Sequence, residues 1–339
     1  MYPRLEIDLS IISENITRIQ KKCQQWNLQP VAVTKGFCAD PPLVRLLLSS
    51  GITCFADSNI LNLRRIQNLT SQPVELYLIR LPMVSECPVI TDLHIIPFVS
   101  HLEILEILDR EAGKRGVNCP VILAVENGDG REGFLPEELL AASETIRRFR
   151  HLTIRGLSTT LACLSGVLPN ESKIREFIQW KRAFVEKTGL RDVILSVGGT
   201  TFFSLWEDGL ILPEVNQIRC GEAFLFGSDI SRKRDMAWLR QGAFYIETEI
   251  VEVREKKPEW NQDPGYDAFG RIPSHQLLLP YPHKRALLAM GLQDIDDSQL
   301  YLERGHVKII GATSNYLVID IEDDETDYHV GEVIRFRAG

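Results

Sequence analysis

The stretch from residue 31 to residue 56 reads VAVTKGFCADPPLVRLLLSSGITCFA and contains one strand–helix–strand unit. Val31–Thr34 and Thr53–Ala56 are short apolar runs with β-branched residues, which is typical of buried strands. Between them, Pro42–Ser50 has the periodicity of an amphipathic helix, and Gly51 follows it as a stop signal. Apolar strands that alternate with helices indicate a parallel sheet covered by helices.

The same unit repeats over the first two-thirds of the chain. Further strands are expected at Glu75–Ile79, Leu93–Val99, Val121–Val125, Leu152–Leu157, Val193–Val197 and Val215–Cys220. Further helices are expected at Ile60–Leu69, Leu102–Arg115, Pro136–Phe149 and Ser172–Thr188. Eight strands in this span favour a closed (β/α)8 barrel of the TIM type over the alternative, an open doubly wound sheet. No glycine-rich dinucleotide motif follows the first strand, which also weighs against the open sheet.

After residue 235 the pattern changes to short strands separated by turn residues. Gln241–Arg254 has the alternating faces of a long strand, and shorter strands are expected at Arg285–Met290, Lys308–Ala312, Tyr316–Ile321 and Val333–Arg337. Arg4–Leu9 is an isolated strand that could pair with them. We therefore expect a barrel domain over residues 10–235, and a C-terminal all-β domain over residues 236–339 together with strand 1–9.

The composition is that of an ordinary globular protein, with 44% hydrophobic and 25% charged residues. The net charge is −8, and acidic and basic residues are interspersed along the chain, so no basic region suggests binding to nucleic acid or to an anionic membrane. No apolar run reaches the length of a membrane span, and the N-terminus has no signal-peptide core. The seven scattered cysteines have no metal-ligand spacing and indicate reduced thiols, so we expect a cytoplasmic protein without a metal.

In barrels of this kind the active-site residues lie just past the C-terminal ends of the strands. Lys35 ends the first strand, and the amine of a lysine can form a Schiff base with a carbonyl compound. Taken alone, a solvated lysine at a strand end is the commoner interpretation. Arg131 lies in the glycine-rich turn after the fifth strand, where it could face an anionic oxygen or could be a surface arginine in an ordinary turn.

Two more strand ends carry candidate binding groups. The seventh strand ends in Gly-Gly-Thr-Thr, so that Gly199, Thr200 and Thr201 lie at a helix start, where backbone N–H groups and hydroxyls can hold a phosphate. The eighth strand ends in Arg219-Cys-Gly221-Glu222, which places an arginine and a glycine at the same mouth.

The order of these motifs, followed by a β-domain, resembles the alanine racemase family of fold-type III pyridoxal phosphate enzymes. The branch of ornithine and related amino-acid racemases is the most similar, through Lys35-Gly-Phe-Cys-Ala, Phe55-Ala-Asp-Ser, Gly130-Arg-Glu-Gly-Phe, Asp267-Ala-Phe-Gly and Gly291-Leu-Gln-Asp. The resemblance spans almost the whole chain. It implies a pyridoxal 5'-phosphate enzyme that inverts the α-carbon of a free amino acid.

The resemblance also implies a role for each candidate residue. Lys35 is expected to carry the cofactor and to act as one of two acid/base groups. Arg219 is expected to face the pyridine nitrogen, where a guanidinium can only donate; this favours racemisation over transamination. Arg131 is expected near the phenolic oxygen. The phosphate is expected at the Gly199–Thr201 loop, chiefly at Thr200, and at the backbone N–H groups of Gly221 and Glu222.

Three positions differ from the alanine racemase pattern and agree with the ornithine racemase branch. Ala39 stands where a tyrosine is expected, Thr160 replaces a histidine, and Phe269 aligns with the catalytic tyrosine. These differences imply another substrate, ornithine before lysine, and another second base. In the loop Pro264–Gly270 the candidates are Asp267, which we favour, and Tyr266; an aspartate that merely caps the turn is the structural alternative.

The resemblance further implies a homodimer in which the β-domain of one subunit covers the barrel of the other. Two alternative functions keep the same cofactor. A non-catalytic pyridoxal phosphate carrier would generally lack the C-terminal β-domain. A metal-dependent D-amino-acid aldolase would need His or Cys ligands near the C-terminus, where His306 and His329 have no convincing partners.

Overall fold

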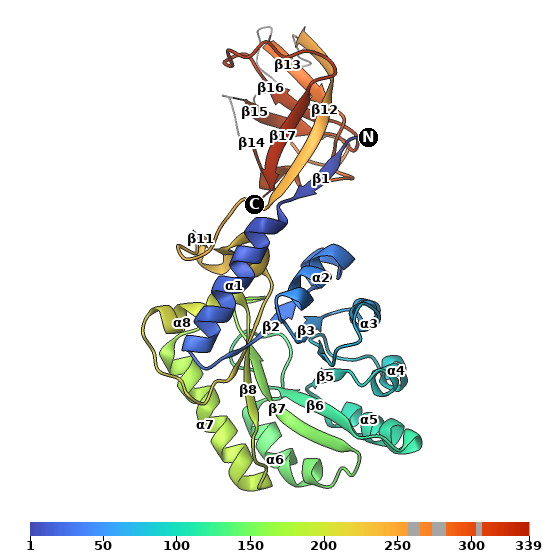
Figure 1. The fold of residues 1–339 in the computed structure, drawn as a ribbon, viewed down its shortest axis with the longest axis vertical. Coiled ribbons are helices and arrows are strands. Elements are labelled where there is room, and N and C mark those ends of the chain that lie inside the picture. The colour runs from blue at the N-terminus through green and yellow to red at the C-terminus, as the bar shows by residue number, and fades with distance from the viewer. Residues whose placement is uncertain (257–264, 273–282, 303–306, 339) are drawn as a thin grey trace. The chain divides into compact units, whose positions relative to one another are not determined.

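The structure is a computed structural model that describes residues 1–256, 265–272, 283–302 and 307–338 (Figure 1). The chain forms two compact units. One comprises Leu9–Gln241, and the other comprises Met1–Asp8 together with Gly242–Gly339.

The first unit is a closed barrel of eight parallel strands, as the alternating pattern predicted. β9 pairs with β2, with Gln217 opposite Gln29, and this pairing closes the barrel. A closed barrel has no exposed strand edge, and the C-terminal ends of its strands meet at one mouth. The strands are β2 (Gln29–Val33), β3 (Cys54–Asp57), β4 (Glu75–Leu78), β5 (Ile96–Val99), β6 (Cys119–Ala124), β7 (Leu152–Thr160), β8 (Ile194–Gly198) and β9 (Gln217–Cys220).

Helices surround these strands (Figure 1). Five of them follow the predicted ranges closely: α2 (Pro41–Ser49), α3 (Ile60–Asn68), α5 (Leu102–Arg115), α6 (Pro136–Arg147) and α7 (Glu171–Thr188). The short helix α8 (Phe203–Glu207) follows the Gly-Gly-Thr-Thr loop, where a helix start was expected. The short helices α4 (Cys87–Asp92) and α9 (Glu222–Phe226) were not predicted. Neither was α1 (Leu9–Gln25), although it buries Ile12, Ile16, Ile19 and Cys23, which have helical spacing.

The barrel interior is packed with side chains from alternate strand positions. Val31, Ala56, Tyr77, Phe98 and Ile122 belong to one buried cluster. Burial of an aliphatic or aromatic side chain of this size stabilises the fold by about 1.5–3 kcal/mol. The interior also contains polar groups from β8 and β9, and these groups lead to the site described below.

The second unit is an antiparallel sheet in the order β14-β17-β12-β13-β16-β15, with β1 (Arg4–Ile7) added against β12 (Phe244–Lys256). Arg4 lies opposite Glu247, and their side chains form an ion pair at 2.6 Å. The N-terminal strand therefore pairs with the β-domain as predicted. The remaining strands are β13 (His283–Leu288), β14 (Leu300–Leu302), which was not predicted, β15 (Lys308–Ala312), β16 (Leu317–Asp320) and β17 (Val333–Ala338).

Within the described ranges, no helix is both long and apolar enough to cross a membrane. The seven cysteines are all free thiols.

Candidate active site

A cavity of about 900 Å³ opens at the C-terminal ends of the barrel strands. Its walls include all eight residues for which the sequence predicted contact with a cofactor: Lys35, Arg131, Gly199, Thr200, Thr201, Arg219, Gly221 and Glu222. They come from the segments that follow β2, β6 and β8 and from the C-terminal end of β9. The fold therefore gathers at one place residues that lie far apart in the sequence.

Lys35 opens the short 3-10 helix η1 (Lys35–Phe37), because β2 ends at Val33, slightly before the predicted strand end. The hydroxyl of Thr34 donates to Asp57 Oδ2 at 2.6 Å and ties this corner to the end of β3. The Lys35 side chain is exposed and lines the cavity. Among the described residues, its amine has neither a hydrogen bond nor an ion pair, so it is accessible to a ligand.

Arg219 lies in the cavity wall and is almost completely buried, with 4% of its surface exposed. Its Nη1 donates to Ser196 Oγ at 2.7 Å, and its Nη2 donates to the carbonyl oxygen of Thr159 at 3.0 Å and to Thr160 Oγ1 at 2.9 Å. The guanidinium also lies 4.8 Å from the centre of the Phe98 ring. Burial lowers the pKa of Arg219 to about 9, so the group remains a cation at neutral pH.

Gly198 makes room for this guanidinium. A Cβ atom at position 198 would lie 2.7 Å from Arg219 Cζ, closer than real side-chain carbons approach. Any other residue at this position would therefore displace the arginine.

Arg131 lies in a turn that the carboxylate of Glu126 organises. Glu126 accepts hydrogen bonds from the backbone N–H groups of Gly130 at 3.1 Å and Arg131 at 3.2 Å. The Arg131 guanidinium forms an ion pair with the adjacent Glu132 and donates to Cys163 Sγ at 2.6 Å. The cation thus lines the cavity as one half of an ion pair.

Two short helices begin at the cavity wall. Gly199 has a φ of 114°, a left-handed value that favours glycine, and it turns the chain from β8 into η3 (Thr200–Phe202). Thr200 Oγ1 accepts from the backbone N–H of Ala223 in α9 at 3.2 Å, which joins the two helix starts. The first N–H groups of a helix have no partner within it and favour an anion.

Gly221 and Glu222 complete this wall. A Cβ at Gly221 would lie 2.9 Å from the carbonyl oxygen of Val33, so only glycine fits where the two strand ends meet. The carboxylate of Glu222 accepts from Ser228 Oγ at 2.8 Å and from the Ile230 backbone N–H at 2.7 Å. Burial raises the pKa of Glu222. The carboxylate of Glu222 is thus engaged within the protein. The group that Glu222 can offer to a ligand is its backbone N–H, at the first position of α9.

Tyr266 and Asp267 belong to the β-domain unit. Asp267 Oδ1 accepts from the backbone N–H groups of Phe269 and Arg271, both at 2.8 Å. Asp267 therefore caps this turn, which is the structural role that the sequence offered as an alternative to a catalytic one. Tyr266 is 74% exposed. Pro264, the first residue of the predicted loop, lies outside the described residues.

Sequence reasoning missed a set of polar side chains inside the barrel: Glu75, Tyr77, Ser196 and Gln217. The available signal was their presence in otherwise apolar strands, because polar groups are buried in a core only when they have partners. Thr160 was singled out only as a substitution, yet it contacts Arg219 directly.

No group of His, Cys, Asp and Glu suited to a metal ion occurs in the described part of the chain. His306, one of the two histidines considered as metal ligands, lies outside that part.

The closed (β/α)8 barrel and the cavity at the C-terminal ends of its strands are the arrangement found in TIM-barrel enzymes. The sequence model of the alanine racemase N-terminal domain matches residues 7–229. The chain belongs to the alanine racemase family, which depends on pyridoxal phosphate. The family and the fold predicted from the sequence are thereby confirmed.

Two curated relatives match over nearly their whole length. An ornithine racemase of Acetoanaerobium sticklandii is 30% identical, with 100% of this chain and 95% of the relative covered. A lysine racemase of Thermotoga maritima is 32% identical, with 99% and 93% covered.

The solved structures that match show the fold. An alanine racemase from Clostridium difficile 630 has a TM-score of 0.77 at 17% identity, covering 98% of this chain and 86% of that one. The alanine racemase from Bartonella henselae, solved with covalently bound pyridoxal phosphate, has a TM-score of 0.76 at 16% identity, covering 99% and 90%.

Proposed function

We propose that this protein is a pyridoxal phosphate-dependent amino-acid racemase that acts on a basic amino acid, ornithine before lysine. The observation that carries the proposal is the meeting of Lys35, Arg219 and two helix starts in one cavity. Family membership and the two full-length relatives named as racemases of basic amino acids support it.

The donor groups of the cavity fit the parts of the cofactor. Lys35 offers an accessible amine to the aldehyde, and the helix starts at Thr200 and Glu222, with Gly221, offer N–H groups and a hydroxyl to the phosphate. Arg219 would hold the pyridine nitrogen, and Arg131 the phenolic oxygen. When bound, pyridoxal phosphate supplies an electron-withdrawing ring that stabilises negative charge at the substrate's α-carbon.

The residues then divide the work. Lys35 would take or return the α-proton on one face of the substrate. Arg219 donates hydrogen bonds and keeps its proton at neutral pH, so it would leave the ring nitrogen as an acceptor and limit the charge that the ring absorbs. Return of the proton to the α-carbon is then favoured over transfer of the amino group.

Inversion requires a second proton donor on the opposite face. Our candidate is Asp267, whose Oδ1 is held by the turn; among the described residues, its Oδ2 accepts no hydrogen bond. Tyr266 is the next candidate, since Phe269 carries no group that can transfer a proton.

Lys35 is exposed in the single chain, whereas proton transfer at carbon needs a site that excludes water. We therefore infer a homodimer in which the partner's β-domain covers the barrel mouth. The free thiols support a cytoplasmic location.

The C-terminal β-domain favours a racemase over a non-catalytic pyridoxal phosphate carrier, which would generally lack such a domain. The direct test is to incubate the purified protein with single enantiomers of the common amino acids and follow optical rotation. We expect rotation to decay fastest for ornithine. Constant rotation with every amino acid, while pyridoxal phosphate is bound, would instead indicate a carrier.

A further inference from the structure

A continuous chain of hydrogen bonds starts at Arg219 and runs down the barrel interior. Arg219 Nη1 donates to Ser196 Oγ at 2.7 Å, and Ser196 Oγ donates to Gln217 Oε1 at 2.7 Å. Gln217 Nε2 donates to the Tyr77 hydroxyl at 3.1 Å, which donates to Glu75 Oε2 at 2.5 Å. We call these five residues the barrel chain.

Every bond of the barrel chain points the same way, from a cation to an anion. Ser196, Gln217 and Tyr77 are at most 2% exposed, so little water competes for their bonds. In a low-dielectric interior, hydrogen bonds arranged head to tail polarise and strengthen one another. The amide of Gln217 does not exchange protons readily, so the barrel chain transmits polarisation and orientation, not protons.

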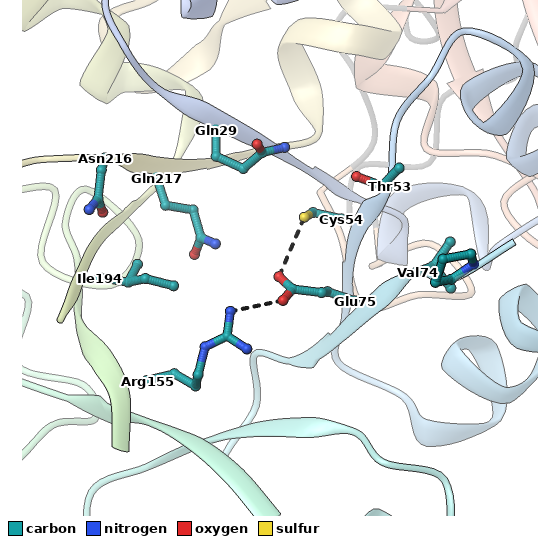
Figure 2. A pocket seen from close by; sticks show the side chains of 10 residues that line it. Gln29, Thr53, Cys54, Val74, Glu75, Arg155, Ile194, Asn216 and Gln217 are labelled. Atoms are coloured by element: carbon teal, nitrogen blue, oxygen red, sulfur yellow. Dashed lines mark hydrogen bonds and ion pairs between the residues drawn. The ribbon is translucent and has the colours of Figure 1, made fainter. Parts of the chain in front are cut away.

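The anionic end lies at the opposite, N-terminal side of the barrel. Figure 2 shows Glu75 and Arg155 meeting at a second cavity of about 600 Å³, with the thiol of Cys54 on the other side of the carboxylate. Arg155 Nη2 donates to Glu75 Oε1 at 2.8 Å, and Cys54 Sγ to Glu75 Oε2 at 3.6 Å. Although burial acts to raise it, hydrogen bonds from Tyr77 and Arg155 hold the pKa of Glu75 below its ordinary value. Glu75 is therefore a carboxylate at neutral pH.

We propose that Glu75, Tyr77 and Gln217 are positioning residues that act through Ser196 on Arg219. A serine oxygen polarised by a distant carboxylate is a stronger acceptor, so it fixes the guanidinium and draws its positive charge away from the cavity. Arg219 then donates more weakly to the cofactor's ring nitrogen, which keeps racemisation ahead of transamination. This inference rests on the proposed function.

Tyr77→Phe tests the proposal, because it removes one hydroxyl from the barrel chain and keeps the ring that packs in the core. Two quantities are measured on the holoenzyme. One is the absorption band of bound pyridoxal phosphate; the other is the rate of transamination, which yields the 2-oxo acid and pyridoxamine phosphate, relative to racemisation. We expect a shifted band and a ratio raised roughly three- to tenfold.

The double variant Tyr77→Phe/Glu75→Gln shows whether Glu75 and Tyr77 act on Arg219 through one hydrogen-bond chain or independently of each other. Glu75→Gln removes the negative charge at the end of the chain, and Tyr77→Phe removes the hydroxyl through which that charge acts on Gln217. Once the hydroxyl is gone the charge has no further effect, so we expect the double variant to match Tyr77→Phe alone. Gln217→Met breaks the chain at another bond and should give the same shift. The matched control is Tyr328→Phe, a buried tyrosine of the β-domain outside the barrel chain, which should change neither quantity.

An unchanged band and ratio in both Tyr77→Phe and Gln217→Met would overturn the proposal, as would a double variant with a larger band shift and ratio than Tyr77→Phe alone. A wild-type protein that binds no pyridoxal phosphate would contradict the proposed function itself, which is a different outcome.

Discussion

Thr160 and Arg219 are joined by a hydrogen bond of 2.9 Å from Nη2 to Oγ1. Thr160 is the residue that the resemblance to alanine racemases aligns with a histidine. A neutral hydroxyl, which does not titrate near neutral pH, thus takes part in holding the arginine.

Replacement of Thr160 by valine keeps the shape of the side chain and removes the acceptor. Since a buried donor of Arg219 then loses a partner, we expect kcat/KM to fall about tenfold, equivalent to about 1.4 kcal/mol. Thr160→Ser retains the hydroxyl and is the matched control, with activity near wild type. Equal loss in the two variants would show that the methyl group, not the hydrogen bond, matters.

Asp267→Asn tests the second base. Because asparagine cannot take up the proton and can still cap the turn through its amide oxygen, we expect the fold to persist and racemisation to fall at least a hundredfold. Exchange of the α-deuterium should persist for one enantiomer, through Lys35. Near-wild-type rates in both directions would eliminate Asp267, and Tyr266→Phe would then be measured in the same assay.

The proposed homodimer, in which the β-domain of one subunit covers the barrel mouth of the other, predicts complementation between inactive variants. In that arrangement Lys35 and Asp267 of one site come from different subunits, so a mixed dimer of Lys35→Ala and Asp267→Asn would contain one site with both residues intact. After the two variants are unfolded and refolded together, we expect about a quarter of wild-type activity, because half of random dimers are mixed and each has one working site. Recovered activity at the background of the separate variants, or a fully active monomer by light scattering, would contradict the shared site.

Much of this architecture follows from the sequence. The strands and five helices have regular apolar spacing, and the rule that barrel sites follow strand ends located Lys35 and Arg219. The barrel chain escaped prediction because its bonds join distant strands: Gln217 and Tyr77 are 140 positions apart. The ion pair of Arg131 with Glu132 depends on the local course of a glycine-rich turn, which residue spacing does not specify. Helix α1 had the required pattern and was overlooked.

The lowered pKa of Glu75 in the folded protein predicts how the stability of the protein depends on pH. The folded pKa of Glu75 lies below the ordinary value of 4.5, so the contribution of Glu75 to stability is complete above that pH and is lost as the pH falls through the folded pKa. The free energy of unfolding of the wild type should therefore converge on that of Glu75→Gln as the medium becomes acidic below pH 4.5. Urea unfolding of both proteins measures this; a difference that stays constant with pH would contradict the ionised form of Glu75.

We propose Lys35 as the cofactor-bearing lysine of a racemase, and chemical labelling tests this directly. The purified protein with pyridoxal phosphate should be treated with borohydride, digested and mapped by mass spectrometry, with Lys35→Ala treated in parallel. We predict a reduced, stable pyridoxyl group on the peptide that contains Lys35 and none in the variant. A label on another lysine, or no label on a protein that racemises ornithine, would contradict the assignment of Lys35.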